Sequence, residues 1–130
     1  MLRTATLLGL TLASWWIHGA EPRPDARIFR GKNLDAVAMP VGGIGTGTVW
    51  VTGDGRLGVW QVFNNYDESP LPDTFLAVRA GGQTRVLQQA EGWGLKGFED
   101  VSCLAEYPFL KTTFRDANLP VKVEIESFNP

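Results

Sequence analysis

The stretch MPVGGIGTGTVW at residues 39–50 is where residue types and spacing first suggest chemistry, because its glycines resemble a phosphate-binding loop. A dinucleotide-binding loop needs Gly-x-Gly-x-x-Gly and then a helix, whose first amides face the pyrophosphate. Counted from Gly43, the third glycine would fall at position 48, which is a threonine. A Walker loop needs lysine after its last glycine, but Gly47 is followed by threonine. Both nucleotide-binding templates fail.

The residues that follow the glycines argue for a different role. TVWV at 48–51 is β-branched and aromatic and alternates as a strand does. The glycines would then permit a close approach between two backbones, or unusual φ values at a bend entering a strand. We expect Gly42, Gly43, Gly45 and Gly47 to contribute to a domain interface or to the rim of a cleft.

Histidine and cysteine offer little chemistry. His18 is the only histidine and Cys103 the only cysteine. Because His18 lies in a segment that we expect to be removed, the mature chain would have no imidazole for metal binding, proton transfer or a Ser–His pair. A single thiol forms no internal disulfide. We therefore expect no metal site, no cofactor and no binding residues for one.

Three tryptophans could stack on sugar rings, since an aromatic face suits the C–H side of a hexose. Trp50 lies in the TVWV stretch, and Trp60 alternates with Gly58 and Val62, which favours a place in the core or an interface. Trp93 stands between two glycines in a loop and is the best candidate for an exposed contact with a sugar. We also expect its loop and the glycine bend to form one surface, at a domain interface or at the rim of a cleft.

The elements that would position these residues are strands. Val123 and Ile125 alternate with Lys122, Glu124 and Glu126, which predicts a strand with one buried face. Glycine-bearing segments at 52–56 and 80–84 are typical of hairpin turns, and 64–72 and 90–97 read as longer loops. No amphipathic helix is evident, so we predict an all-β antiparallel β-sandwich. The predicted strands are 47–51, 57–63, 74–80, 84–88, 110–115 and 121–127.

The two ends of the chain add expectations about organisation. A positive start and an apolar run to Ile17, ending near Gly19 and Ala20, predict a cleavable signal peptide over residues 1–20, too short to leave a membrane span. Residues 21–35 are expected to be a connector and 36–130 the sandwich. The strand at 121–127 would leave an open sheet edge, so we expect the sandwich to be incomplete and the chain to be part of a longer protein.

Composition excludes one class of partner. The formal net charge is −2, and Lys and Arg are spread singly between acidic residues. Affinity for nucleic acid needs clustered positive charge, so no nucleic-acid partner is expected.

With a signal peptide, the protein would be exported to the periplasm or the cell exterior.

Several separated blocks carry a resemblance: MPVGGIGTGTVWVTGDGRLGVWQVFNN, PDTFLAVRAGGQTRVLQQ, GWGLKGF and AEYPFLKTTFRDANLPVKVEIESFNP. In this order they resemble the N-terminal domain of glycoside hydrolase family 116, which includes β-glucosidases and non-lysosomal glucosylceramidases. The resemblance covers roughly residues 37–130. It implies a β-sandwich that precedes an (α/α) barrel holding the catalytic Glu and Asp. No position here matches those motifs, so this fragment is expected to be inactive alone.

The acidic residues of this chain are a poor substitute for that catalytic pair. A retaining glycosidase needs two carboxyl groups about 5 Å apart, one of them poised as an acid. The acids here fall in turns and loops, where solvated carboxylates are normal, and we interpret them as surface groups. An alternative function is a free-standing carbohydrate-binding or adhesion module. The acids considered are Asp54, Asp67, Glu68, Glu99, Asp100 and Glu106.

Overall fold

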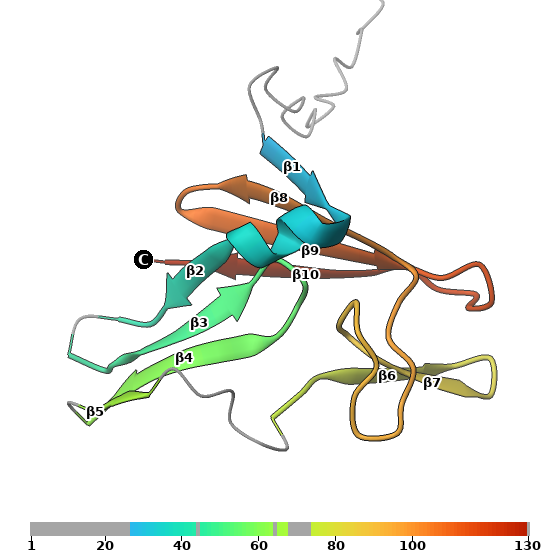
Figure 1. Cartoon of the computed structure of the whole chain (residues 1–130), viewed down its shortest axis with the longest axis horizontal. Helices are drawn as coiled ribbons and strands as arrows, with labels where there is room; N and C mark the ends of the chain where they lie inside the picture. Colours follow the sequence, from blue (N-terminus) through green and yellow to red (C-terminus); the bar gives the residue numbers. More distant parts are fainter. Residues whose placement is uncertain (1–26, 44, 64, 68–73, 130) are drawn as a thin grey trace, which may run out of the picture.

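The computed structural model describes residues 27–43, 45–63, 65–67 and 74–129 (Figure 1). These residues form two four-stranded antiparallel sheets and a two-stranded hairpin, and their one helical element is a short 3-10 helix. The prediction of an all-β antiparallel fold is confirmed. The expected signal peptide at 1–20, the first part of the expected connector and Glu68 lie outside the described residues.

The first sheet has the strand order β1-β8-β9-β10, with every neighbouring pair antiparallel. Val123 and Ile125 of β10 pack against the core while Glu124 and Glu126 are exposed, as the alternation predicted. In the described residues β10 pairs only with β9, so its other side is a sheet edge. The strands are β1 Arg27–Arg30, β8 Asp100–Glu106, β9 Phe109–Arg115 and β10 Val123–Phe128.

The second sheet has the order β2-β3-β4-β5 and contains the glycine stretch between its first two strands. The pairing of β3 with β4 shifts register between Val49 and Val51. The strands predicted at 47–51 and 57–63 are confirmed to within one residue. The strands are β2 Ala38–Val41, β3 Thr48–Thr52, β4 Leu57–Val62 and β5 Asn65–Asp67.

The third sheet is the hairpin of β6 Ala77–Ala80 and β7 Gln83–Val86. Its two-residue turn places Gly81 at φ 56° and Gly82 at φ 76°. Positive φ at both central positions matches the right-handed twist of hairpin strands, and glycine adopts it without strain. The predicted turn at 80–84 is confirmed.

Several elements were not predicted. β1 and the 3-10 helix η1 Gly31–Ala36 fall largely within the segment expected to be a connector, yet β1 pairs with β8 and Leu34 of η1 is fully buried. Residues 27–35 are therefore part of the folded body, and the connector assignment is wrong for them. β8 was missed because its buried face includes Cys103 and the small Ala105, which give a weak apolar signal. β2 and β5 were missed as well.

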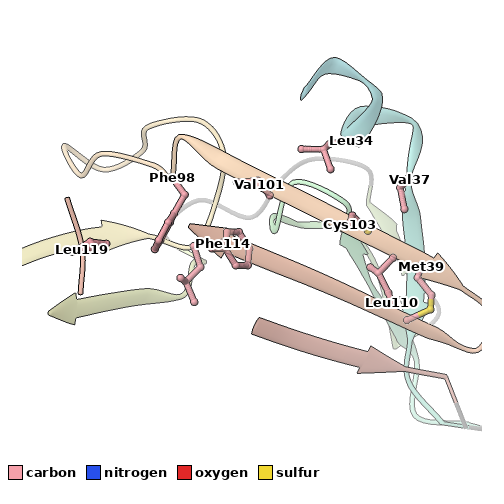
Figure 2. Close-up of a cluster of buried hydrophobic side chains, with 10 residues drawn as sticks. Leu34, Val37, Met39, Phe98, Val101, Cys103, Leu110, Phe114 and Leu119 are labelled. Atoms are coloured by element: carbon pink, nitrogen blue, oxygen red, sulfur yellow. The ribbon is translucent and has the colours of Figure 1, made fainter. Parts of the chain in front are cut away.

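The core lies between the two larger sheets (Figure 2). Phe98 and Phe114 meet at its centre with ring centroids 5.5 Å apart, and both are almost fully buried. Burying a side chain of this size contributes roughly 1.5–3 kcal/mol. Side chains from the first sheet, from η1, from the second sheet and from the loop after β7 all contribute to the core. The buried hydrophobic cluster is Leu34, Val37, Met39, Leu87, Phe98, Val101, Cys103, Leu110, Phe114 and Leu119.

Candidate functional site

The glycine stretch forms the turn between β2 and β3. The Gly43 amide donates to Thr46 Oγ1 (2.8 Å), and the Thr46 hydroxyl donates to the Gly43 carbonyl (2.8 Å). This amide is therefore engaged within the turn and is not presented to an anion. The turn leads into a strand, so a helix N-terminus that could face a phosphate is missing at this position. The strand that follows the glycines agrees with the prediction from TVWV at 48–51.

Two of the glycines, Gly42 and Gly47, permit a close approach between backbones, as the sequence indicated. A Cβ on Gly47 would overlap the carbonyl oxygen of Gln61 on β4, and a Cβ on Gly42 would overlap the carbonyl of Gly47. Gly45 and Gly47 also have φ of 78° and 81°, a region that other residues rarely adopt. The turn is thus held tightly against β4.

Large exposed hydrophobic side chains gather around this turn, and we call them the apolar end. Val41 and Gly42 face Phe128 across a groove of about 340 Å³, whose wall also includes Glu126 and Ser127. The Phe128 ring lies 6.5 Å from that of Phe109, and the Asn129 amide donates to the Pro108 carbonyl. In Figure 1 the β2–β3, β4–β5 and β8–β9 turns and the end of β10 lie on the left. The apolar end comprises Phe63, Tyr107, Phe109 and Phe128, and the half-buried Val41 lies next to Phe128 in the groove.

The exposure of this end is unusual for side chains of this kind. Phe63 is 93% exposed, and Tyr107, Phe109 and Phe128 are each more than half exposed. Phe63 follows Val62, whose backbone lies against Gly47, so it belongs to the same region. Contiguous apolar surface of this kind commonly marks a site of protein association.

The acidic residues are mostly held by bases. Asp54 is buried and accepts hydrogen bonds from Thr52 Oγ1 and Arg56 Nε (2.5 and 2.6 Å), so its interpretation as a solvated acid is wrong. Its burial follows from the tight turn, which packs against the loop after β7 through the Gln89 amide. Asp100 is half exposed and pairs with Arg30 and Arg115. Asp67 and Glu99 are exposed, and Glu106 is half-buried.

The resolved shifts in acidity do not suit acid catalysis. The pKa of Asp116 is lowered by the Asn118 backbone amide and then by Arg85, and the pKa of Glu124 is lowered by the Lys122 ammonium. A glycosidase acid needs the opposite shift. Burial raises the pKa of the Cys103 thiol, with a partial offset from Thr112, so the thiol stays protonated at neutral pH.

In the part of the chain that the structure describes, His, Cys, Asp and Glu form no cluster that could bind a metal. The same residues contain no helix with the length and hydropathy of a membrane span.

Trp93 lies at the tip of a small turn in the loop between β7 and β8. Gly92 and Leu95 exchange two backbone hydrogen bonds (3.0 and 2.9 Å), which leaves Trp93 and Gly94 as the central residues. Their φ values are 54° and 72°. The indole stacks on Phe75 with ring centroids 4.4 Å apart and an angle of 26° between the planes. Trp93 is exposed, as expected.

The other two tryptophans are half-buried, and each has a buried indole nitrogen without a hydrogen-bond partner. Trp50 lines a pocket of about 220 Å³ on the second sheet, together with Arg56 and Leu57. The register pairs Trp60 with Val49, and neither residue is part of the hydrophobic core cluster. A place for Trp60 in a domain interface stays a prediction.

The glycine turn and the Trp93 loop were expected to contribute to one surface. In Figure 1 the β2–β3 turn lies at the left end of the molecule, whereas the loop between β7 and β8 lies near β6 and β7 on the right. The structure does not bring these two segments together. Each therefore needs an explanation of its own.

Comparison with known families decides the relationship. Residues 38–130 match the family model described as beta-glucosidase 2, glycosyl-hydrolase family 116 N-term. The chain belongs to this family. Its membership makes the domain part of a glycoside hydrolase, and the predicted resemblance is confirmed. A search of the curated proteins gave no match.

The family 116 N-terminal domain also extends in space beyond the matched region. β1 and η1 precede residue 38, but β1 completes the first sheet and Leu34 fills the core.

Sequence reasoning did not single out Phe63, Tyr107, Phe109, Phe128 or Phe75. Of these five residues, only Phe63 has a position that could have indicated exposure. It directly precedes two asparagines at a hairpin turn, and the tips of turns face solvent.

Proposed function

We propose that this chain is the non-catalytic β-sandwich of an exported β-glucosidase or glucosylceramidase-like hydrolase, and that its apolar end packs on a catalytic (α/α) barrel. The observation that carries this proposal is the gathering of exposed aromatic side chains around the glycine turn. Covering a large aromatic side chain is worth roughly 1.5–3 kcal/mol, so covering several would hold two domains together.

The acidic residues support a non-catalytic role. Asp54, Asp100 and Asp116 are each paired with arginine. The pKa of Asp116 is lowered by the Asn118 backbone amide and by Arg85, and a carboxyl group with a lowered pKa is a poor proton donor to a leaving group. The hydrolytic carboxyl pair would come from the barrel. The domain would contribute to stability and to the shape of the cleft, with the β-glucoside as an indirect partner.

The proposal is tested with the purified chain and a separately produced catalytic region of a family 116 enzyme. We expect the chain alone to release no product from an aryl β-glucoside above the blank, and to raise the activity and melting temperature of the catalytic region when the two are mixed. Turnover by the chain alone would contradict the non-catalytic role. A monomer that binds glucans and leaves the catalytic region unchanged would favour the free-standing module instead.

Export is proposed from the apolar segment at 1–20 alone. Expression of the full chain in a bacterium and mass measurement of the recovered protein test it. Loss of about 20 residues from the N-terminus of periplasmic material is the expected result, and an intact N-terminus in the cytoplasm would contradict it.

A further inference from the structure

We infer that Phe75 and Trp93 together form a binding platform for the pyranose ring of a β-glucoside, separate from the apolar end. The choice of a sugar as ligand rests on the proposed function, because a β-glucoside-hydrolysing enzyme meets such rings as substrate. The location of the platform rests on the geometry of the loop between β7 and β8.

The first observation is the shape of the exposed surface. The two rings are nearly parallel, 4.4 Å apart and 26° from coplanar, with 36% of Phe75 and 44% of Trp93 exposed. Because the facing sides of the two rings cover each other, Phe75 backs the indole. The part of the indole that stays open offers an aromatic surface for the C–H face of one hexose.

The second observation is the backbone of Trp93. A φ of 54° in this position of a two-residue turn is normally left to glycine or asparagine, and for other residues it costs about 1–2 kcal/mol. Strain of this kind is characteristic of functional positions, where the fold holds a side chain in a required place. Here it holds a bulky indole outward at the tip of the turn.

The third observation is the rigidity of the base. The Val86 amide donates to the Lys96 carbonyl (3.0 Å) and the Phe98 amide to the Gln88 carbonyl (2.8 Å), which ties the loop to β7. Gly97 lies against three carbonyls of residues 88–90, a position that leaves no room for a Cβ. A platform fixed before binding loses little conformational entropy when a ligand arrives.

Two charged residues flank the Trp93 turn in the sequence. Glu91 directly precedes Gly92 and Lys96 directly follows Leu95, and both are exposed. A carboxylate accepts from sugar hydroxyls and an ammonium donates to them.

The test is a titration of the full chain with methyl β-glucoside and cellobiose, followed by the indole NMR signals. We expect the Trp93 signal to shift saturably, Trp93→Ala to weaken binding at least tenfold and Trp93→Phe to retain most of it. Phe109→Ala, an exposed aromatic of the apolar end, is the matched control and should bind as the parent does. Sorbitol, which has no ring, should give no shift.

The outcomes separate this inference from the proposed function. Melting curves of each variant show whether a loss of binding reflects unfolding, and Phe75→Leu gives a second variant that leaves Trp93 in place and should weaken binding. No shift of the Trp93 signal, or equal loss in Phe109→Ala, would overturn the platform. If Trp93→Ala instead weakens association with the catalytic region, the platform is a protein contact and the sugar inference is wrong, while the docking role stands.

Discussion

Two aromatic residues hold a backbone conformation that glycine usually takes. Among the described residues other than glycine, Phe63 (φ 55°) and Trp93 (φ 54°) have positive φ, and each lies in a two-residue hairpin turn. Both rings are exposed, so neither is held there by core packing. The left-handed conformation costs such residues about 1–2 kcal/mol. The stacking of Trp93 on Phe75 offsets part of this cost, whereas the Phe63 ring is almost fully exposed.

Gly47 gives the sharpest prediction for a single residue. Gly47→Ala places a Cβ against the Gln61 carbonyl and keeps a φ of 81°, so we expect the free energy of unfolding to fall by about 2 kcal/mol or more. Gly43→Ala is the matched control in the same turn, since its Cβ would make ordinary contact with Thr46 and needs no positive φ. Urea unfolding of both variants measures the difference, and equal stabilities would contradict the backbone-approach role.

At the scale of elements, a buried ion pair joins the β6–β7 hairpin to the first sheet. An isolated two-stranded hairpin is marginally stable in water. Arg85 of β7 donates to Asp116 after β9 (2.8 Å), and both side chains are almost fully buried. The Asn118 amide donates to the other oxygen of Asp116 (2.8 Å). The carboxylate thus joins the hairpin to the end of the first sheet.

Asp116→Asn should therefore loosen the hairpin. The variant leaves the Arg85 guanidinium buried without a counter-charge, which is costly, so we expect the melting temperature to fall by several degrees. Asp100→Asn breaks a half-exposed pair and should change it little. Thermal melts at neutral pH compare the two, and equal effects would show that the buried pair does not hold the hairpin.

The same pair should give a pH dependence of known sign. Because the pKa of Asp116 is lower in the folded state, its stabilisation is complete above the ordinary aspartate pKa, about 4, and is lost as pH falls through the folded value. The difference between the parent and Asp116→Asn should then shrink in acid.

The elements that the sequence predicted well are those with local signals. β10 alternates regularly, and Gly81 and Gly82 mark their hairpin turn. β1 and β8 lack such a signal, since they pair across more than 70 residues (Arg27 with Ala105) and gain their stability from that distant contact. Asp54 appeared solvated because the sequence does not show that the loop after β7 covers its turn.

The candidate sites also divide into features that have a local sequence signal and features that have none. The close-approach role of the glycines could be predicted from the β-branched residues beside them, and the exposure of Trp93 from its flanking glycines. The apolar end could not be predicted, because it is assembled from turns at 42–47, 63–64 and 107–108 and the end of β10. The strand order within each sheet and the packing of the two sheets on each other place these segments together. The Phe75–Trp93 contact likewise joins residues from two separate loops.

At the scale of the whole molecule, the two ends are distinct. The apolar end contains four large side chains that are each more than half exposed, whereas the platform has two partly exposed rings. The first surface fits a protein partner and the second a single pyranose ring. If both roles hold, the domain would anchor the barrel at one end and engage sugar at the other.

Replacing two side chains of the apolar end tests this division. Phe63→Ser with Phe128→Ser removes apolar surface that is already exposed, so the domain should stay folded while its affinity for the catalytic region falls at least tenfold. Ile28→Ser is the control, because Ile28 is similarly exposed but lies on β1, outside the apolar end. Calorimetric titration measures affinity, and sugar binding by the double variant should equal that of the parent. If Ile28→Ser weakens association as much as the double variant, the barrel contacts the outer face of the first sheet, and the apolar end is not the docking surface.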